Sequence, residues 1–331
     1  MNKKNILWLD SFRGIACMIV VVAHIVSTHS TIGKYASGCG KIGVWCFMVL
    51  SAYLLYRPYC SENRKFGWRD LGEFYIKRVI RIFPVYLVAL IFSYVIGYFP
   101  TVDEILYHLI GVHGAGHFWY MPVIMKFYLV MPLFLWMRCK LHKEKSVVML
   151  LLLMGISLVW KPYTEYIENS TELWWYLPVF FIGMLLAEMV SVGEKRKIKK
   201  AIWYDIVTFI CVIVGILFMP YVRERVWGIA PSGWLQNKYL LYGSLWAIII
   251  LCISCSKYMK AFLEKAKVLG YIGKVSFGVY LFHYPVLMKL SGNYESVWIN
   301  GIITIISSIA LATVVRYGVE KPIEKVKRKI M

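Results

Sequence analysis

Long apolar stretches recur along the whole chain of 331 residues, with short polar segments between them. Each stretch approaches the roughly 20 residues with which a helix crosses about 30 Å of hydrocarbon. We therefore predict an all-α membrane protein, one membrane domain over residues 1–331 with no appended soluble domain. Its ten expected spans cover about residues 8–28, 41–56, 79–99, 119–137, 146–160, 173–192, 203–221, 239–255, 270–290 and 298–318.

Composition and charge support a membrane location. Hydrophobic residues make up 60% of the chain, charged residues only 17%, and the mean hydropathy is +0.61. The net charge of +20 could suggest a nucleic-acid partner, but 27 of the 38 Lys and Arg residues fall on one side of the expected topology and seven on the other. This asymmetry predicts that both termini are cytoplasmic, with membrane lipid rather than nucleic acid as the partner of the charge.

Arg13 and His24 are two chargeable side chains inside the first apolar stretch. Eleven residues are close to three helical turns, so both lie on one face, about 16 Å apart along the axis. Ionisable groups at this depth are unfavourable in lipid, and they indicate a polar path or a reactive site.

The first cytoplasmic loop and the start of the next span concentrate positive charge. Arg78 and Arg81 are spaced i, i+3 on one helical face. A pair of guanidinium groups there could bind a phosphorylated ligand. The other interpretation is a topogenic loop in contact with anionic lipid headgroups.

Two further segments combine histidine with aromatic or small polar residues. His117, Trp119 and Tyr120 follow a glycine-rich loop and could form either a sugar site or an interfacial aromatic belt. His113 and His117 would need a third metal ligand that is not evident, so we expect no metal. Ser276, Tyr280 and His283 share a helix face, which fits either a site or polar packing between helices.

The order of these motifs resembles the acyltransferase-3 family of integral membrane O-acyltransferases, over essentially the whole chain. The matching segments are Leu9–Ala16 with His24, Gly43–Leu54, Lys77–Tyr86, His117–Met121, Ser276–His283 and Val319–Pro322. Each motif is short, but their shared order on a ten-helix chain is specific.

The resemblance implies transfer of an acyl group, most often acetyl, from cytoplasmic acyl-CoA to a hydroxyl of an extracytoplasmic or lipid-linked glycan. It assigns His24 as the essential histidine with Arg13 as its partner, and Arg78 and Arg81 to the acyl-CoA. Imidazole titrates near neutrality and suits a general base, although an acyl-carrying histidine is equally open. The expected location is the bacterial cytoplasmic membrane.

Several positions depart from the family pattern or extend it. Ala52 stands where the family commonly has Gly, and Lys126 precedes Phe127–Tyr128 where branches that modify peptidoglycan and O-antigen have Glu. Lys126 either faces the polar cavity or is a structural lysine. Glu320 is expected to pair with a nearby arginine at the cytoplasmic mouth.

Some members carry a fused extracytoplasmic domain, so transfer is either direct or passes through a separate extracytoplasmic transferase.

Two other classes of function fit the same pattern. A multi-span transporter or flippase for a glycan or small anionic substrate would also place Arg, Lys and His inside a helical bundle. A sensory membrane domain with relict motifs is the third interpretation. No inverted repeat is evident, which disfavours the transporter.

Overall fold

Helices make up nearly all of the described structure. The computed structural model describes residues 4–61, 64–111, 114, 116–160, 171–195, 201–228, 239–291 and 296–330. Within these ranges there is no β-strand, only one isolated bridge between Ala201 and Ser256. The predicted all-α class is confirmed for this part of the chain.

Each apolar stretch overlaps one long helix. In chain order these helices are α1 (Lys4–Ser27), α3 (Gly40–Tyr56), α4 (Trp68–Val95), α6 (Tyr120–Lys140), α7 (Lys143–Trp160), α8 (Leu177–Lys195), α9 (Ile202–Leu217), α12 (Tyr239–Cys255), α14 (Lys267–Ser291) and α15 (Val297–Val315). Shorter elements connect or extend them: α2 (Gly33–Ala36), α5 (Val102–Leu109), α10 (Pro220–Arg225), α13 (Met259–Lys265), the 3₁₀ turns η1 (Arg57–Tyr59), η2 (Gly116–Trp119) and η3 (Leu173–Trp175), a π-helix η4 (Arg316–Glu320), and α16 (Lys321–Ile330).

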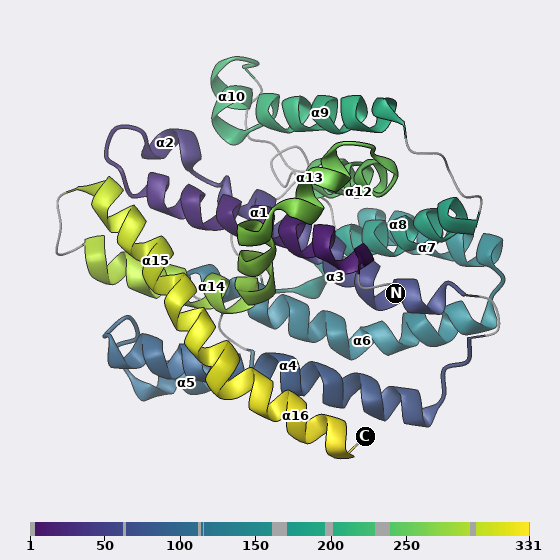
Figure 1. Ribbon diagram of the computed structural model, residues 1–331, viewed down its shortest axis with the longest axis horizontal. Helices are drawn as coiled ribbons and strands as arrows, with labels where there is room; N and C mark the ends of the chain where they lie inside the picture. The colour runs from purple at the N-terminus through teal and green to yellow at the C-terminus, as the bar shows by residue number, and fades with distance from the viewer. Residues whose placement is uncertain are drawn as a thin grey trace.

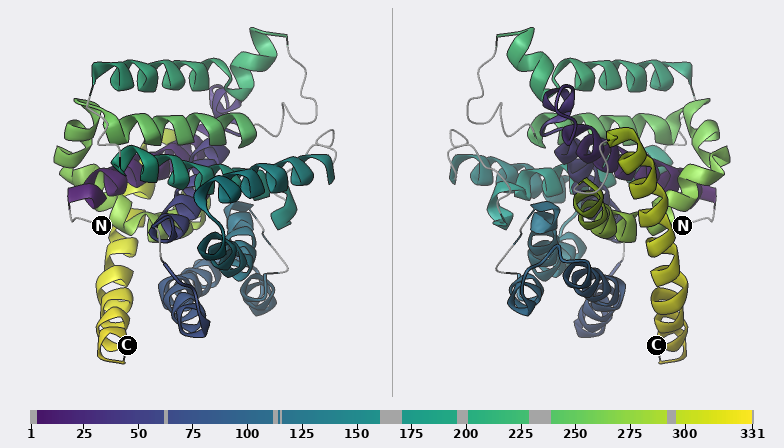
Figure 2. Two further views of the ribbon diagram at one scale, coloured as in Figure 1. Left: turned by 90° about the vertical axis from the view of Figure 1, so that its right-hand side faces the viewer. Right: turned by 90° about the vertical axis from the view of Figure 1, so that its left-hand side faces the viewer.

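The helices form one bundle with distinct ends. Figure 1 shows α2, α5 and α10 at one end and both chain termini toward the other. The side views of Figure 2 place α9 at one edge of the bundle and the C-terminal helix at the opposite edge. The even number of crossings expected from the sequence would give the same arrangement, with both termini on one side.

Membrane crossing is supported by length and composition. Five helical segments of the described chain are long and apolar enough to span a bilayer: Leu7–Ser27, Gly33–Tyr59, Trp68–Val95, Gly116–Lys140 and Val297–Val326. Three shorter apolar helices are Leu177–Ser191, Ile202–Leu217 and Leu240–Cys255. The protein is therefore a multi-pass membrane protein, while the number ten and the cytoplasmic position of the termini stay predictions.

The α1 and α14 backbones approach each other closely at two glycines. A Cβ added at Gly273 would lie 1.7 Å from the carbonyl oxygen of Asp10, and one at Gly14 would lie 2.2 Å from that of Leu269. Glycine permits this approach because no side chain separates the two backbones. On the α15 side of α14, a Cβ at Gly278 would lie 2.8 Å from the Ala312 side chain. Glycines therefore place α14 directly between α1 and α15.

A buried ion pair that sequence reasoning missed joins α6 to α8. Arg138 donates from Nε and Nη2 to the carboxylate of Glu188, and Nη2 also donates to the Cys60 carbonyl at 3.2 Å. Arg138 and Glu188 are 6% and 0% exposed. Buried charges need such partners, because an unpaired one is strongly destabilising.

We expect Gly273→Ala to destabilise the bundle by about 1–3 kcal/mol, because its methyl group must displace the α1 backbone. The measurement is the thermal midpoint of the detergent-purified protein, read from monodisperse size-exclusion recovery after heating. Gly155→Ala in α7 is the matched control, since a Cβ there meets nothing within 4 Å. Equal midpoints for the two variants would contradict the role assigned to the glycine contact.

Candidate active site

Both chargeable side chains of the first span belong to α1 and share one face. Arg13 donates from Nη1 to Oδ1 of Asp10 at 3.0 Å, one turn earlier on the same helix. His24 lies near the end of α1 that leads to α2. The α2 segment is at the end of the bundle opposite the termini (Figure 1). His24 therefore lies closer to that end than Arg13 does, on the same face of α1.

His24 pairs with a second histidine from α14. Its Nδ1 lies 2.8 Å from Nε2 of His283, and the two rings are stacked with centroids 5.1 Å apart. His117 packs against His283 from η2, just before α6, with ring centroids 5.3 Å apart, and the Tyr284 ring centroid lies 5.1 Å from that of His24. We call His24, His117 and His283 the histidine cluster.

Hydrogen bonds to backbone carbonyls define the tautomers of this cluster. Nδ1 of His283 lies 2.7 Å from the carbonyl oxygen of Tyr280, and a carbonyl can only accept, so this nitrogen carries a proton. His283 is fully buried and has no ion pair among the described residues, so its ring is neutral. Its Nε2 then accepts from Nδ1–H of His24. The lone pair of His24 is consequently at Nε2, where it can accept a proton.

The Nε2 atom of His24 faces the start of α3. A Cβ added at Gly40 would lie 3.2 Å from that nitrogen. The absence of a side chain at Gly40 therefore leaves room for the His24 ring. Neither the sequence motif nor helix periodicity identified Gly40, because its role depends on where α3 begins relative to α1.

A first polar cavity of about 310 Å³ reaches from the arginines toward the histidine cluster. We call it the tyrosine cavity. Its polar lining residues come from α1, α3, α4, α6 and α14: Arg13, Ser51, Arg78, Arg81, Tyr120, Tyr128, Ser276 and Tyr280. Its end wall is Tyr280, whose ring lies 5.8 Å from His283 and 5.7 Å from His117. The Tyr280 hydroxyl donates to the His117 carbonyl.

A second polar cavity of about 410 Å³ shares the three arginines with the first. We call it the basic cavity. Its charged lining residues are Asp10, Arg13, Lys77, Arg78, Arg81, Lys274, Arg316, Glu320 and Glu324. Glu320 lies 3.5 Å from Nη1 of Arg316, four residues earlier. Arg13, Arg78 and Arg81 thus stand at the junction of the two cavities.

Five predicted site residues line neither cavity: His24, His117 and His283 of the histidine cluster, Trp119 and Lys126. Trp119 is buried and packs on Tyr176, with ring centroids 5.3 Å apart. Lys126 donates from Nζ to the carbonyl oxygen of Thr171 at 2.9 Å. His113 lies outside the described residues, and the described part of the chain contains no group of three His, Cys, Asp or Glu side chains suited to a metal.

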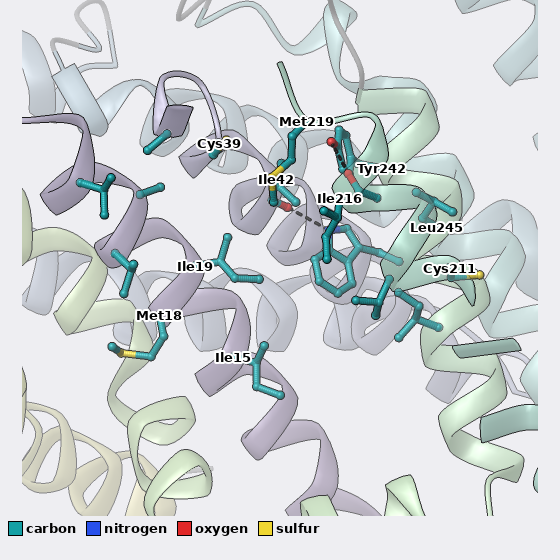
Figure 3. Close-up of a pocket in the computed structure, with 18 of the residues that line it drawn as sticks. Ile15, Met18, Ile19, Cys39, Ile42, Cys211, Ile216, Met219, Tyr242 and Leu245 are labelled. Carbon is teal, nitrogen blue, oxygen red and sulfur yellow. Dashed lines mark hydrogen bonds between the residues drawn. The ribbon is translucent and has the colours of Figure 1, made fainter. Parts of the chain in front are cut away.

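A third cavity, of about 590 Å³, is apolar and separate from the predicted residues. Figure 3 shows Ile15, Met18 and Ile19 of α1 on one side of it and residues of α9 and α12 on the other. His24 follows Ile15 by nine residues, which is half a turn beyond two full turns, so the apolar cavity and the histidine lie on opposite faces of α1. One helix therefore separates an apolar environment from the polar path.

Comparison with known proteins identifies the family. The acyltransferase-3 family model, described as an acyltransferase domain, matches residues 6–317. The chain therefore belongs to this family, and the resemblance seen in the sequence motifs is confirmed.

Curated relatives are similar over most of this chain at low identity. O-acetyltransferase OatA of Staphylococcus aureus is 23% identical, over 96% of this chain and 57% of that protein. Peptidoglycan O-acetyltransferase OatA of Listeria monocytogenes is 24% identical, over 98% and 56%. The putative peptidoglycan O-acetyltransferase YrhL of Bacillus subtilis is 25% identical, over 95% and 54%. The chain spans little more than half the length of these relatives. No solved structure matches it significantly.

Proposed function

We propose that this protein is a membrane O-acetyltransferase, which moves an acetyl group from cytoplasmic acetyl-CoA to a hydroxyl of a cell-envelope glycan. The observation that carries the proposal is the pair of cavities that share Arg13, Arg78 and Arg81, the first of which is also lined by Tyr280, beside the histidine cluster. Family membership and the names of the relatives point to the same chemistry.

The arginines have the chemistry to hold the phosphates of the donor. Nε of Arg78 is buried without a hydrogen-bond partner among the described residues, while its guanidinium lies over the rings of Phe74 and Tyr128. Guanidinium groups form charge-assisted bonds with phosphate oxygens. The pantetheine arm then extends through the tyrosine cavity, along Ser276 and Tyr280, and carries the thioester toward His24.

In the transfer step His24 acts as the general base. Its Nε2 takes the proton of the acceptor hydroxyl, and the hydroxyl oxygen attacks the thioester carbonyl. The new C–O ester bond forms as the C–S bond breaks. The leaving thiolate recovers the proton from the His24 imidazolium, so coenzyme A departs as a thiol. His283 positions His24 and selects its tautomer, as partners of catalytic histidines do.

The acceptor approaches from the end of the bundle that carries α2 and α10. The positive-inside distribution assigns this end to the outer face of the bacterial cytoplasmic membrane, and it assigns the arginines to the cytoplasmic half. His117 is placed to contact the acceptor beside His24. The glycan hydroxyl is acetylated directly, or the acetyl group passes to a separate extracytoplasmic transferase.

The first test supplies radiolabelled acetyl-CoA to the cytoplasmic face of inside-out vesicles and measures base-labile label in glycan. His24→Ala should lower the rate by about 10²–10⁴-fold, since it removes the base. Arg78→Ala should raise the KM for acetyl-CoA, and Arg69→Ala is its control because that side chain is exposed on the same helix. No label with the wild-type protein, with its native acceptor present, would refute the proposal and favour a transporter.

The role of His283 can be separated from simple packing. His283→Leu should lower kcat by about 10²-fold, because nothing then orients the His24 ring. His283→Gln should recover much of that loss, because its amide oxygen can accept from Nδ1–H of His24. The readout is kcat in the same assay, beside the thermal midpoint of each variant. Equal losses in both variants at unchanged stability would contradict the tautomer assignment.

Gly40→Ala should lower transfer about tenfold or more, because its methyl group crowds Nε2 of His24 and small misplacements at a reacting atom are costly. Gly215→Ala is the matched control, since a Cβ there makes an ordinary contact of 3.7 Å with Tyr242 beside the apolar cavity. The assay compares kcat at saturating acetyl-CoA. Full activity in Gly40→Ala would show that the acceptor does not use this approach.

A further inference from the structure

The basic cavity holds more positive charge than the three arginines at its junction. Lys274 of α14 and Arg316 of η4 line this cavity but not the tyrosine cavity. Nη1 of Arg316 donates to the Lys274 carbonyl at 2.8 Å, so the two residues are direct neighbours. Together they form a second basic position in this cavity, beside the Arg13, Arg78 and Arg81 group.

The charges of this cavity are unbalanced. Six Lys and Arg side chains line it against three carboxylates. Asp10 pairs with Arg13, Glu320 pairs with Arg316, and Lys77 pairs with Glu73 at 2.6 Å. Among the residues that the structure describes, Arg78, Arg81 and Lys274 form no ion pair. An excess of positive charge that the neighbouring carboxylates do not balance favours an anionic ligand.

A local irregularity of the last long helix presents Arg316 to the cavity. Residues Arg316–Glu320 form a π-helix between α15 and α16, and such insertions are frequent at functional sites. The Lys274 carbonyl and the Glu320 carboxylate hold the Arg316 guanidinium in place. A guanidinium held in this way loses little conformational entropy when it binds an anion.

The two basic positions match a donor with two separate phosphate groups. We propose that Lys274 and Arg316 bind the ribose 3′-phosphate of coenzyme A, while Arg13, Arg78 and Arg81 bind the pyrophosphate. The arginines stand where the tyrosine cavity begins, so the pyrophosphate that carries the pantetheine arm belongs there. The second position then distinguishes coenzyme A from donors that lack the ribose phosphate. This inference rests on the proposed use of acyl-CoA.

Equilibrium binding tests the proposal without requiring turnover. Purified protein in neutral detergent is titrated with radiolabelled coenzyme A, with unlabelled coenzyme A and dephospho-coenzyme A as competitors. The wild type should bind coenzyme A about tenfold more tightly than the dephospho form, the effect of one charge-assisted contact. Lys274→Ala should abolish that difference by weakening only coenzyme A. Lys274→Arg should retain it.

The control and the alternative ligand are part of the same experiment. Lys267→Ala removes an exposed cation from the same helix outside both cavities and should behave as wild type. Equal affinities of wild type for the two competitors, or an equal loss for both in Lys274→Ala, would overturn the proposal. Loss of anionic-lipid binding in Lys274→Ala, with an unchanged preference for coenzyme A, would also overturn it and assign Lys274 to lipid headgroups. Failure to bind either coenzyme form would instead refute the acyl-CoA function itself.

Discussion

The close contact between α1 and α14 is the constraint on which the rest of the site depends. Glycines at positions 14 and 273 let the two backbones meet, with Asp10 and Leu269 carbonyls directly opposite them. Because the helices are in contact at this level, His24 meets His283 further along the pair. A larger residue at either glycine would separate the helices, and the histidine pair would separate with them.

The two faces of α1 have different surroundings. One face carries Arg13, which lines the tyrosine cavity, and His24, which pairs with His283, whereas the other lines the apolar cavity of Figure 3. Charged groups within a membrane protein are tolerated where they meet partners or a polar cavity. The arrangement places three arginines at one depth and an imidazole nitrogen at another, the separation that the proposed transfer across the bilayer requires.

Much of this could be predicted from residue patterns. The apolar stretches located the long helices, because a bilayer requires a run of that length. Helical periodicity put Arg13 with His24, and Arg78 with Arg81, on common faces. The ordered motifs indicated the family that the comparison confirmed. Helical periodicity also placed His283 and Tyr280 on one helix face. The residues that contact them could not be inferred, because helix pairing depends on contacts between distant parts of the chain.

The sequence by itself determined the all-α class, the membrane location and the residue types that carry the chemistry, because hydrophobic length and helical periodicity are local properties. Only the tertiary structure decided which helices meet. It joined His24 to His283, turned Nε2 of His24 toward Gly40, placed Lys274 beside Arg316, and bonded Lys126 to the Thr171 carbonyl. These contacts join residues far apart in the chain, and their geometry depends on backbone approach and side-chain packing that no local pattern encodes.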